Sequence, residues 1–315
     1  MAIWREVDGA DTAPFAEPTV VTIGTFDGVH LGHQSLLARA CEVAEERPIV
    51  AVTFDPHPVA VFAPDRVPAL LTGIERRVEL LRAEGAGEVR VLAFSREMAV
   101  WSPEEFVRRV LIEDLRAAHV VVGENFTYGS KASGDVATLT RFGAEHGFAV
   151  DALPLAGDAQ EYSSSLVRRL VAGGDVAAAA RILGRPAEVS GVVTRGDQRG
   201  RDLGFPTANV PVASGFAVPG DGVYAAWVVP LSQDAGQRWP AAVSVGDNPT
   251  FDGTERRVEA YVLDRTDLDL YDQEIRVEFV QRLRGMEAFG SVEALVEQMH
   301  ADVAAARRAL GLPPA

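Results

Sequence analysis

The stretch TIGTFDGVHLGHQSLL, residues 22–37, carries the strongest structural signal of the chain. An apolar, β-branched segment leads into it, glycines interrupt it, and a helical pattern of apolar residues begins near its end, so it predicts a strand, a turn and a helix. Two histidines, His30 and His33, stand where the strand gives way to the helix. Free backbone N–H groups and the positive end of a helix dipole meet at such a point, which favours a bound anion.

Strand and helix patterns alternate on both sides of this stretch through the first half of the chain. Short apolar, β-branched runs predict strands, and several segments between them have helical spacing. Such alternation is typical of a parallel sheet with helices on both faces, the Rossmann-like arrangement of the α/β class. The predicted strands are 19–24, 47–54, 88–94, 118–123 and 148–155, and the predicted helices are 34–46, 74–84 and 103–115.

Polar segments follow three of these predicted strands. Residues 25–33 follow the first strand, residues 55–58 the second, and residues 124–135 the fourth. Parallel sheets of this class bind ligands beyond the carboxyl ends of their strands. We therefore expect the three polar segments to share one rim of the sheet and to form a binding site there.

The sequence changes character near residue 186. Two short helical segments over 163–184 precede this point, and strand patterns with turn residues between them follow it, with no helical period until Ser291. We expect an α/β domain over 1–185 and a small antiparallel β-barrel with a docked C-terminal helix over 186–315. The barrel strands are predicted near 187–195, 222–229, 240–246, 256–263 and 274–283, and the packed helix stripe comprises Val292, Leu295, Val296, Met299 and Val303.

Composition narrows the functional class. A net charge of −15 over 315 residues argues against nucleic acid or an anionic membrane as a partner. No apolar run reaches the roughly 18 residues of a membrane span, and we expect a cytoplasmic protein of unknown oligomeric state. Cys41, the only cysteine, is expected to be a small buried side chain. Lys131 is the only lysine, and its surroundings do not fit G-x-x-x-x-G-K-[ST], so any ATP must be bound without that loop.

The residues alone leave the histidine pair open to three interpretations: phosphate donors, half of a metal site, or ordinary turn histidines. Three further segments carry a resemblance to a known family. Together with TFDPHP (53–58), VVGENFTYG (121–129) and YSSSLVRRLVAGGD (162–175), the histidine stretch resembles the H-x-G-H signature of nucleotidyltransferases. It is most similar to the adenylyltransferase module of bifunctional riboflavin kinase/FAD synthetases, over roughly residues 15–185.

This resemblance implies that the first half transfers the adenylyl group of ATP to FMN, with release of pyrophosphate. His30 and His33 would be catalytic, holding the phosphates of ATP and stabilising charge at the α-phosphorus. Asn125 would contact the flavin phosphate or ATP. The other residues that the resemblance assigns to ATP phosphates in this half are Gly24, Phe26, Gly32, Ser163, Ser164 and Arg168.

The second half carries its own signature. The string LGFPTAN, residues 203–209, closely matches that of flavokinases, and the resemblance covers roughly residues 186–310. It implies that riboflavin is phosphorylated to FMN by Mg²⁺–ATP, with Thr207 and Asn209 as magnesium ligands. Glu259, on the polar face of the predicted strand RRVEAYVLD, would accept the proton of the ribityl hydroxyl. Further assignments are Gly196, Arg201 and Gly204 to ATP, and Arg284 and Glu287 to the flavin.

Two alternatives remain open at this point. Leu31 stands where the family often has arginine, so the adenylyltransferase could be weak or inactive beside a working riboflavin kinase. A non-catalytic flavin-binding sensor would keep both folds but would have no use for the base Glu259.

Overall fold

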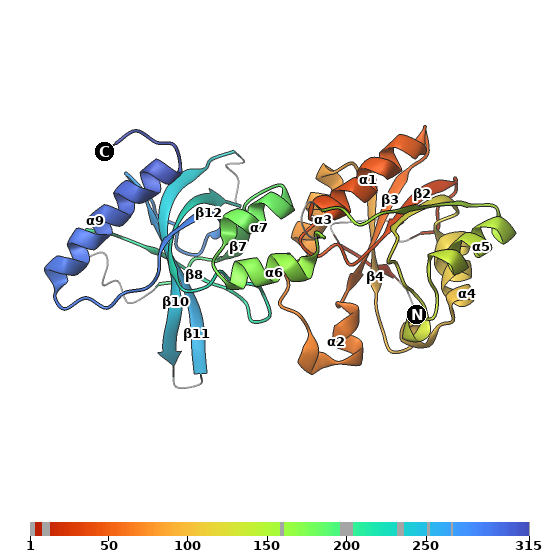
Figure 1. The fold of residues 1–315 in the computed structure, drawn as a ribbon, viewed down its shortest axis with the longest axis horizontal. Coiled ribbons are helices and arrows are strands. Elements are labelled where there is room, and N and C mark those ends of the chain that lie inside the picture. The colour runs from red at the N-terminus through yellow and green to blue at the C-terminus, as the bar shows by residue number, and fades with distance from the viewer. Residues whose placement is uncertain are drawn as a thin grey trace. The chain divides into compact units, whose positions relative to one another are not determined.

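The computed structural model describes residues 4–7, 13–157, 161–195, 204–231, 236–250, 253–265 and 267–314, without the side chains of 247–250 and 253–255. The chain forms two compact units, Met1–Ser164 and Ser165–Ala315. In Figure 1 the first is a sheet with helices around it, and the second is built mainly from strands. Gly196 and Arg201, two of the residues that the resemblance assigns to ATP, lie outside the described residues.

A sheet forms the centre of the first unit. Among the described residues its strand order is β1-β4-β3-β2-β5-β6, and all neighbours are parallel except β1 and β4. The strands are β1 Trp4–Arg5, β2 Thr19–Ile23, β3 Ile49–Asp55, β4 Glu88–Ala93, β5 Ala117–Gly123 and β6 Ala149–Leu153. The predicted parallel sheet is confirmed. The chain order reverses between β2 and β5, and sheets of this class bind ligands at such a reversal.

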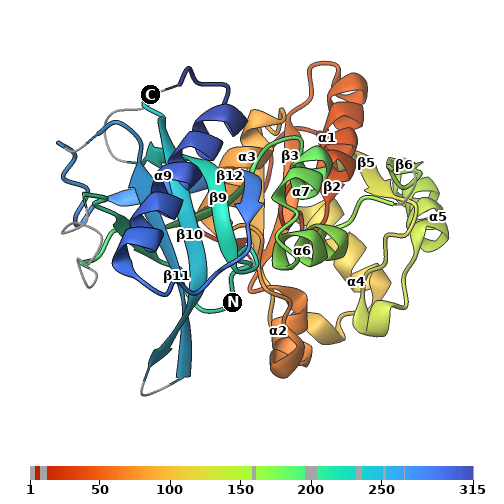
Figure 2. The same cartoon turned by 60° about the vertical axis from the view of Figure 1, so that its left-hand side comes forward.

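Helices cover both faces of this sheet, as predicted (Figure 2). They are α1 Leu31–Ala44, α2 Pro58–Phe62, α3 Ile74–Ala83, α4 Pro103–Phe106 and α5 Val136–His146, with a π-helix at Val107–Asp114 and single 3₁₀ turns at Pro64–Arg66, Met98–Val100 and Ser130–Ala132. Neighbouring residues of β2 face opposite sides. Val20 packs with apolar residues of α1 and α3, whereas Val21 packs with those of α4 and α5.

The first unit differs from the sequence-based prediction in several details, among them the antiparallel edge strand β1, which was not predicted. Helix α1 begins at Leu31, earlier than predicted, because His30 is its N-cap residue. The helix predicted over 103–115 changes from α to π geometry at Val107. The sequence pattern did not predict α2 and α5. The expectation for Cys41 is wrong, since this side chain is exposed on α1.

The second unit begins with two helices and continues into a barrel. Helices α6 Ser164–Ala172 and α7 Val176–Leu183 are separated by Gly174, whose φ of +79° suits glycine. Val176 of α7 packs into the core of the barrel, which explains why the compact unit starts before residue 186. A functional boundary at residue 185 stays a prediction.

The antiparallel barrel is nearly closed, which confirms the predicted architecture. Among the described residues its strand order is β7-β12-β9-β10-β11-β8, and a bridge between Thr194 and Asn209 links its two edges. The strands are β7 Ala187–Val192, β8 Ala208–Pro211, β9 Gly222–Pro230, β10 Trp239–Thr250, β11 Gly253–Val262 and β12 Glu274–Arg284. The short strand β8 was not predicted.

The predicted C-terminal helix is present as α9, Val292–Ala309, with the Ser291 hydroxyl accepting a hydrogen bond from the N–H of Ala294 at 3.2 Å. It docks on the barrel through Val303 and Ala306, which pack against Ala225. The predicted stripe is wrong at its start, because Val292 in the first helical turn is 56% exposed. None of the described helices is long and apolar enough to cross a membrane.

Candidate active sites

The loop between β2 and α1 has an unusual backbone. Phe26, Gly28 and Val29 adopt φ values of 49°, 83° and 40°. Glycine tolerates this region, but a bulky or β-branched residue is strained there. Phe26 and Val29 are both fully buried, and the N–H of Val29 donates to the carbonyl of Phe26 at 3.0 Å. Tertiary packing therefore holds the loop in a conformation that the isolated segment would avoid.

Two of the predicted phosphate-site glycines allow rings to approach this loop closely. A Cβ atom at Gly24 would lie 3.1 Å from the ring of Phe26, and one at Gly32 would lie 3.1 Å from the ring of His30. Such distances are shorter than ordinary van der Waals contact. A side chain at either position would require the neighbouring ring to shift by a few tenths of an ångström.

The structure brings His30 and His33 together. Their rings are stacked with centroids 3.7 Å apart and planes inclined by 22°, and the ring of Phe26 lies edge-on to His33 at 5.1 Å. Burial of the His33 imidazole, the neighbouring His30 and the nearby Arg77 cation all lower the pKa of His33 well below its usual value of 6.5. His33 is therefore neutral at pH 7 and can donate a single N–H hydrogen bond.

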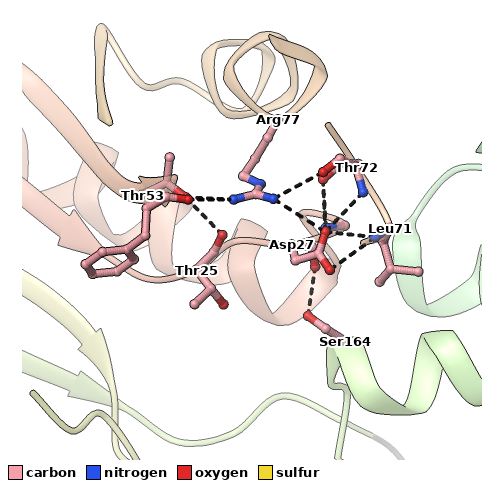
Figure 3. A network of polar contacts seen from close by, with 9 residues as sticks. Thr25, Asp27, Thr53, Leu71, Thr72, Arg77 and Ser164 are labelled. Atoms are coloured by element: carbon pink, nitrogen blue, oxygen red, sulfur yellow. Dashed lines mark hydrogen bonds and ion pairs between the residues drawn. The ribbon is translucent and has the colours of Figure 1, made fainter. Parts of the chain in front are cut away.

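A buried polar network lies beneath the loop (Figure 3). The Asp27 carboxylate accepts hydrogen bonds from the backbone N–H groups of Leu71 and Thr72, each at 3.0 Å, and its oxygen Oδ1 lies 3.7 Å from Nη2 of Arg77. The sequence pattern signalled none of these partners, because they come from a segment more than 40 residues away. An aspartate in a glycine-containing turn was the only local sign.

A cavity of about 860 Å³ opens beyond the carboxyl ends of β2, β3 and β5. All three segments predicted to share one rim contribute to it, through Gly24–Thr25, 57–59 and 125–132. The predicted shared rim is confirmed, and its role in binding stays a prediction. A fourth wall, Phe94 with Met98–Trp101, follows β4 and was not predicted.

The cavity is lined mainly by aromatic and aliphatic side chains. Phe94 lies at the centre of an aromatic cluster in this lining, because its ring centroid is 5.9 Å from that of Phe54 and 5.6 Å from that of Phe62. Asn125, predicted as a ligand-binding residue, also lines the cavity, with other polar residues that include His57 and Lys131. A mostly apolar cleft of this size with few polar groups suits a flat organic ring system.

The predicted second phosphate element lies at the start of α6. Ser163 directly precedes the helix, Ser164 is its first residue, and Arg168 follows one turn later. The hydroxyl of Ser164 donates to the carbonyl oxygen of Asp27 at 2.8 Å. This residue therefore contacts the histidine loop itself, a position that the resemblance did not specify.

On the barrel, the structure brings Glu259 and Asn209 together. Glu259 of β11 is directly opposite Asn209 of β8 on one side and Ser244 of β10 on the other. Its neighbours Val258 and Ala260 point into the core, so these three polar residues form a row on the outer face. Glu259 is partly buried there.

The other predicted site residues of the barrel lie at two separate places, before β8 and at the end of β12. Thr207 immediately precedes β8, and Gly204 has a φ of 86° in the turn before it. Arg284 forms a two-pronged ion pair with Asp302 of α9, with Nε–Oδ1 and Nη2–Oδ2 distances of 2.8 and 2.7 Å. These bonds raise the pKa of Arg284 and fasten the helix to β12. Glu287 is exposed in the segment that follows, and flavin contacts for Arg284 and Glu287 stay predictions.

No group of three or more His, Cys, Asp or Glu side chains suited to a metal ion occurs in the described parts of the chain. Among these described residues, His30 and His33 therefore do not belong to a group of three or more such side chains. The phosphate-binding role of His30 and His33 stays a prediction.

Comparison with known proteins covers both units. The FAD synthetase family model matches residues 12–166, and the riboflavin kinase family model matches residues 183–310. The bifunctional riboflavin kinase/FMN adenylyltransferase of Pseudomonas fluorescens is 41% identical over 300 residues, covering 94% of each chain. The protein of the same description from Escherichia coli K12 is 34% identical and covers 99% of each chain.

A solved structure shares the fold of almost the whole chain. It is described as a macrolide-efflux protein from Streptococcus pneumoniae, is 32% identical, and superposes with a TM-score of 0.85 over 94% of this chain and 95% of its own. The family models and the full-length relatives agree with the motifs in both halves. The chain belongs to the family of bifunctional riboflavin kinase/FMN adenylyltransferases.

Proposed function

We propose that this protein phosphorylates riboflavin to FMN in its barrel and adenylylates FMN to FAD in its first unit, with ATP as co-substrate of both reactions. The observation that carries the proposal is the stacked pair His30–His33 in a loop whose residues Gly24 and Thr25 also line an aromatic cavity. A phosphate site and a flat-ring site would thereby be joined within one unit. A cytoplasmic location would suit a protein that draws on ATP.

For adenylyl transfer, the aromatic cavity would hold the isoalloxazine ring of FMN and the start of α1 would hold the phosphates of ATP. A phosphate oxygen of FMN attacks the α-phosphorus, and the bond to pyrophosphate breaks. This nucleophile is already an anion at pH 7, so no general base is needed. His30 and the neutral His33 would donate hydrogen bonds to the phosphate oxygens as negative charge moves onto them.

For riboflavin phosphorylation, the nucleophile is a neutral alcohol and a base is needed. Glu259 would accept the proton as the ribityl 5′-oxygen attacks the γ-phosphorus and ADP leaves. The donor set at the neighbouring positions fits Mg²⁺, because the Asn209 amide nitrogen lies 3.4 Å from Thr194 Oγ1 and leaves the amide oxygen as a ligand. Thr207 and Asn209 would hold this ion, which neutralises charge on the phosphates when bound.

One assay tests both activities. The protein is incubated with riboflavin, ATP and Mg²⁺, and riboflavin, FMN and FAD are separated by chromatography. Accumulation of FMN and FAD supports the proposal, absence of FMN contradicts the kinase, and absence of FAD from supplied FMN contradicts the adenylyltransferase. In the double variant H30A/H33A, the rate of FAD formation should fall by a factor on the order of 100 or more, while FMN is still made.

A further inference from the structure

Asp27 and Arg77 are both buried, at 0% and 3% exposure, directly beneath the strained histidine loop. The catalytic assignment of His30 and His33 gives them no role. We propose that Asp27, Thr72 and Arg77 are positioning residues that hold the histidine loop in the geometry needed for adenylyl transfer. This inference rests on the proposed adenylyl-transfer function of the loop and adds residues that act through His30 and His33.

Thr72 joins two points of the loop. Its hydroxyl donates to the Asp27 carboxylate at 3.3 Å and accepts a hydrogen bond from the N–H of Gly28 at 3.1 Å. The backbone N–H of Thr72 also donates to Asp27. One side chain thus restrains the two residues that stand between the left-handed positions Phe26 and Val29.

Arg77 is connected to two points of the same loop, to Thr25 through Thr53 and to Asp27 directly. Its Nη1 donates to Thr53 Oγ1 at 3.3 Å, and the Thr53 hydroxyl in turn donates to the carbonyl of Thr25 at 2.9 Å. Its Nη2 donates to the carbonyl of Thr72 at 3.1 Å and faces the Asp27 carboxylate. Figure 3 shows this guanidinium between the two branches of the network.

Strain explains why such a network is needed. Backbone conformations like those of Phe26 and Val29 persist only where surrounding contacts over-determine them. His30 follows Val29 directly, so any relaxation of the loop would move the stacked imidazoles away from the phosphates. Misplacement of a catalytic group by about 1 Å can cost 100-fold in rate. Restraint of the loop is therefore a requirement for chemistry as well as for stability.

Ser164 adds a restraint from a third segment of the chain. Its hydroxyl donates to the carbonyl of Asp27, the same residue whose carboxylate binds the 71–72 segment. Asp27 thus joins the histidine loop to the turn before α3 and to the start of α6. Three segments that are distant in sequence meet at this one buried residue.

The test compares two buried threonines of the same unit. Thr72 is 3% exposed, and Thr19 is 0% exposed, with its hydroxyl donating to the carbonyl of Leu115 at 2.7 Å at the opposite end of β2. T72V removes the hydroxyl bridge at nearly constant volume, T19V removes a comparable hydrogen bond away from the loop, and T72S keeps the hydroxyl. Steady-state kinetics of FMN adenylylation and of riboflavin phosphorylation are measured for the full-length protein and each variant.

We expect T72V to lower kcat for adenylylation by a factor on the order of 10 to 100, with KM for FMN within about threefold. T72S and T19V should stay within about threefold of the parent in kcat, and riboflavin phosphorylation should be unchanged in all three variants. Equal losses in T72V and T19V, or a T72V variant as fast as the parent, would overturn the proposal.

A second readout does not depend on activity. The protein has six histidines, so their ring-proton NMR signals can be assigned by substitution. Stacking at 3.7 Å shifts the signals of His30 and His33 upfield. These two signals should move in T72V and stay in T19V. If the parent protein makes no FAD, the proposed function is contradicted. The positioning role is tested separately, because unchanged ring-proton signals of His30 and His33 in T72V would overturn it whether or not FAD is made.

Discussion

Glu259 and Asn209 lie directly opposite each other on β11 and β8, on the outer face of the barrel. A residue with a carboxylate and one with an amide are thereby paired across two strands, where the flavokinase-like segment LGFPTAN enters β8. An isolated glutamate on a polar strand face would be an ordinary solvated residue. The pairing with Asn209 is what makes Glu259 the best candidate for the base of the kinase.

Glu259→Gln keeps the size of the side chain and removes its basicity. We expect kinase turnover to fall by a factor on the order of 100 to 10,000 with KM for riboflavin largely retained, because only the transition state needs the proton acceptor. Conversion of supplied FMN to FAD should be unchanged. The matched control is Glu274→Gln, an exposed carboxylate at the start of β12, and turnover of E259Q equal to that of E274Q would remove Glu259 from the mechanism.

The low pKa of His33 predicts how stability depends on pH. Folded His33 stays neutral below pH 6.5 because of its burial and the neighbouring His30 and Arg77, whereas His33 in the unfolded chain takes up a proton there. The unfolded state then binds more protons, so the free energy of unfolding falls as pH drops below about 6.5.

Native-state hydrogen exchange of the α1 amides at pH 7.5 and 5.5 measures this loss in the first unit. Protection should decrease on acidification in the parent and less so in His33→Gln, which lacks the titrating group. The control is His146→Gln, an exposed histidine at the end of α5, which should behave like the parent. An identical pH response of parent and H33Q would contradict a depressed pKa.

The cavity predicts a binding role for Phe62. This side chain lines the cavity yet is 60% exposed, so its removal should cost little stability. Loss of one aromatic contact worth about 1 kcal/mol should raise KM for FMN by a factor of roughly 5, with kcat retained. Leu231→Ala, an exposed apolar residue of the other unit, is the control for Phe62→Ala. Equal KM values for the two variants would argue that FMN does not reach this wall.

The sequence predicted the sheet, the barrel and the rim of the site because these follow from repeated local patterns. Strand alternation and turn residues recur over many positions, and the carboxyl ends of parallel strands must meet at one edge. Short elements such as β1 and β8 carry too few residues to show a period. Their pairing is decided by tertiary contacts instead.

Within the site, sequence reasoning found the chemical groups and missed their supports. His30, His33 and Glu259 stand in recognisable motifs. Arg77, by contrast, occurs in an ordinary amphipathic helix pattern, where it is expected to be solvated, and only the fold buries it against Asp27. The aromatic cluster around Phe94 is likewise assembled from separate segments, with Phe54 on β3 and Phe62 on α2, so no local pattern predicts it.

The ion pair between Arg284 and Asp302 allows a structural role to be separated from a flavin contact. The resemblance assigns Arg284 to the flavin, but both prongs of its guanidinium bind Asp302, which is 7% exposed. Removing either partner leaves the other charge poorly compensated, so Arg284→Met and Asp302→Asn should each lower the free energy of unfolding, by about 1–3 kcal/mol for this largely buried pair.

The double variant R284M/D302N completes the cycle. If Arg284 acts mainly as the anchor of α9, the double variant should be destabilised by less than the sum of the single variants, because both substitutions remove one interaction. KM for riboflavin should then rise to a similar extent in R284M and D302N. A selective increase of KM in R284M, with D302N close to the parent, would show instead that the guanidinium contacts the flavin directly.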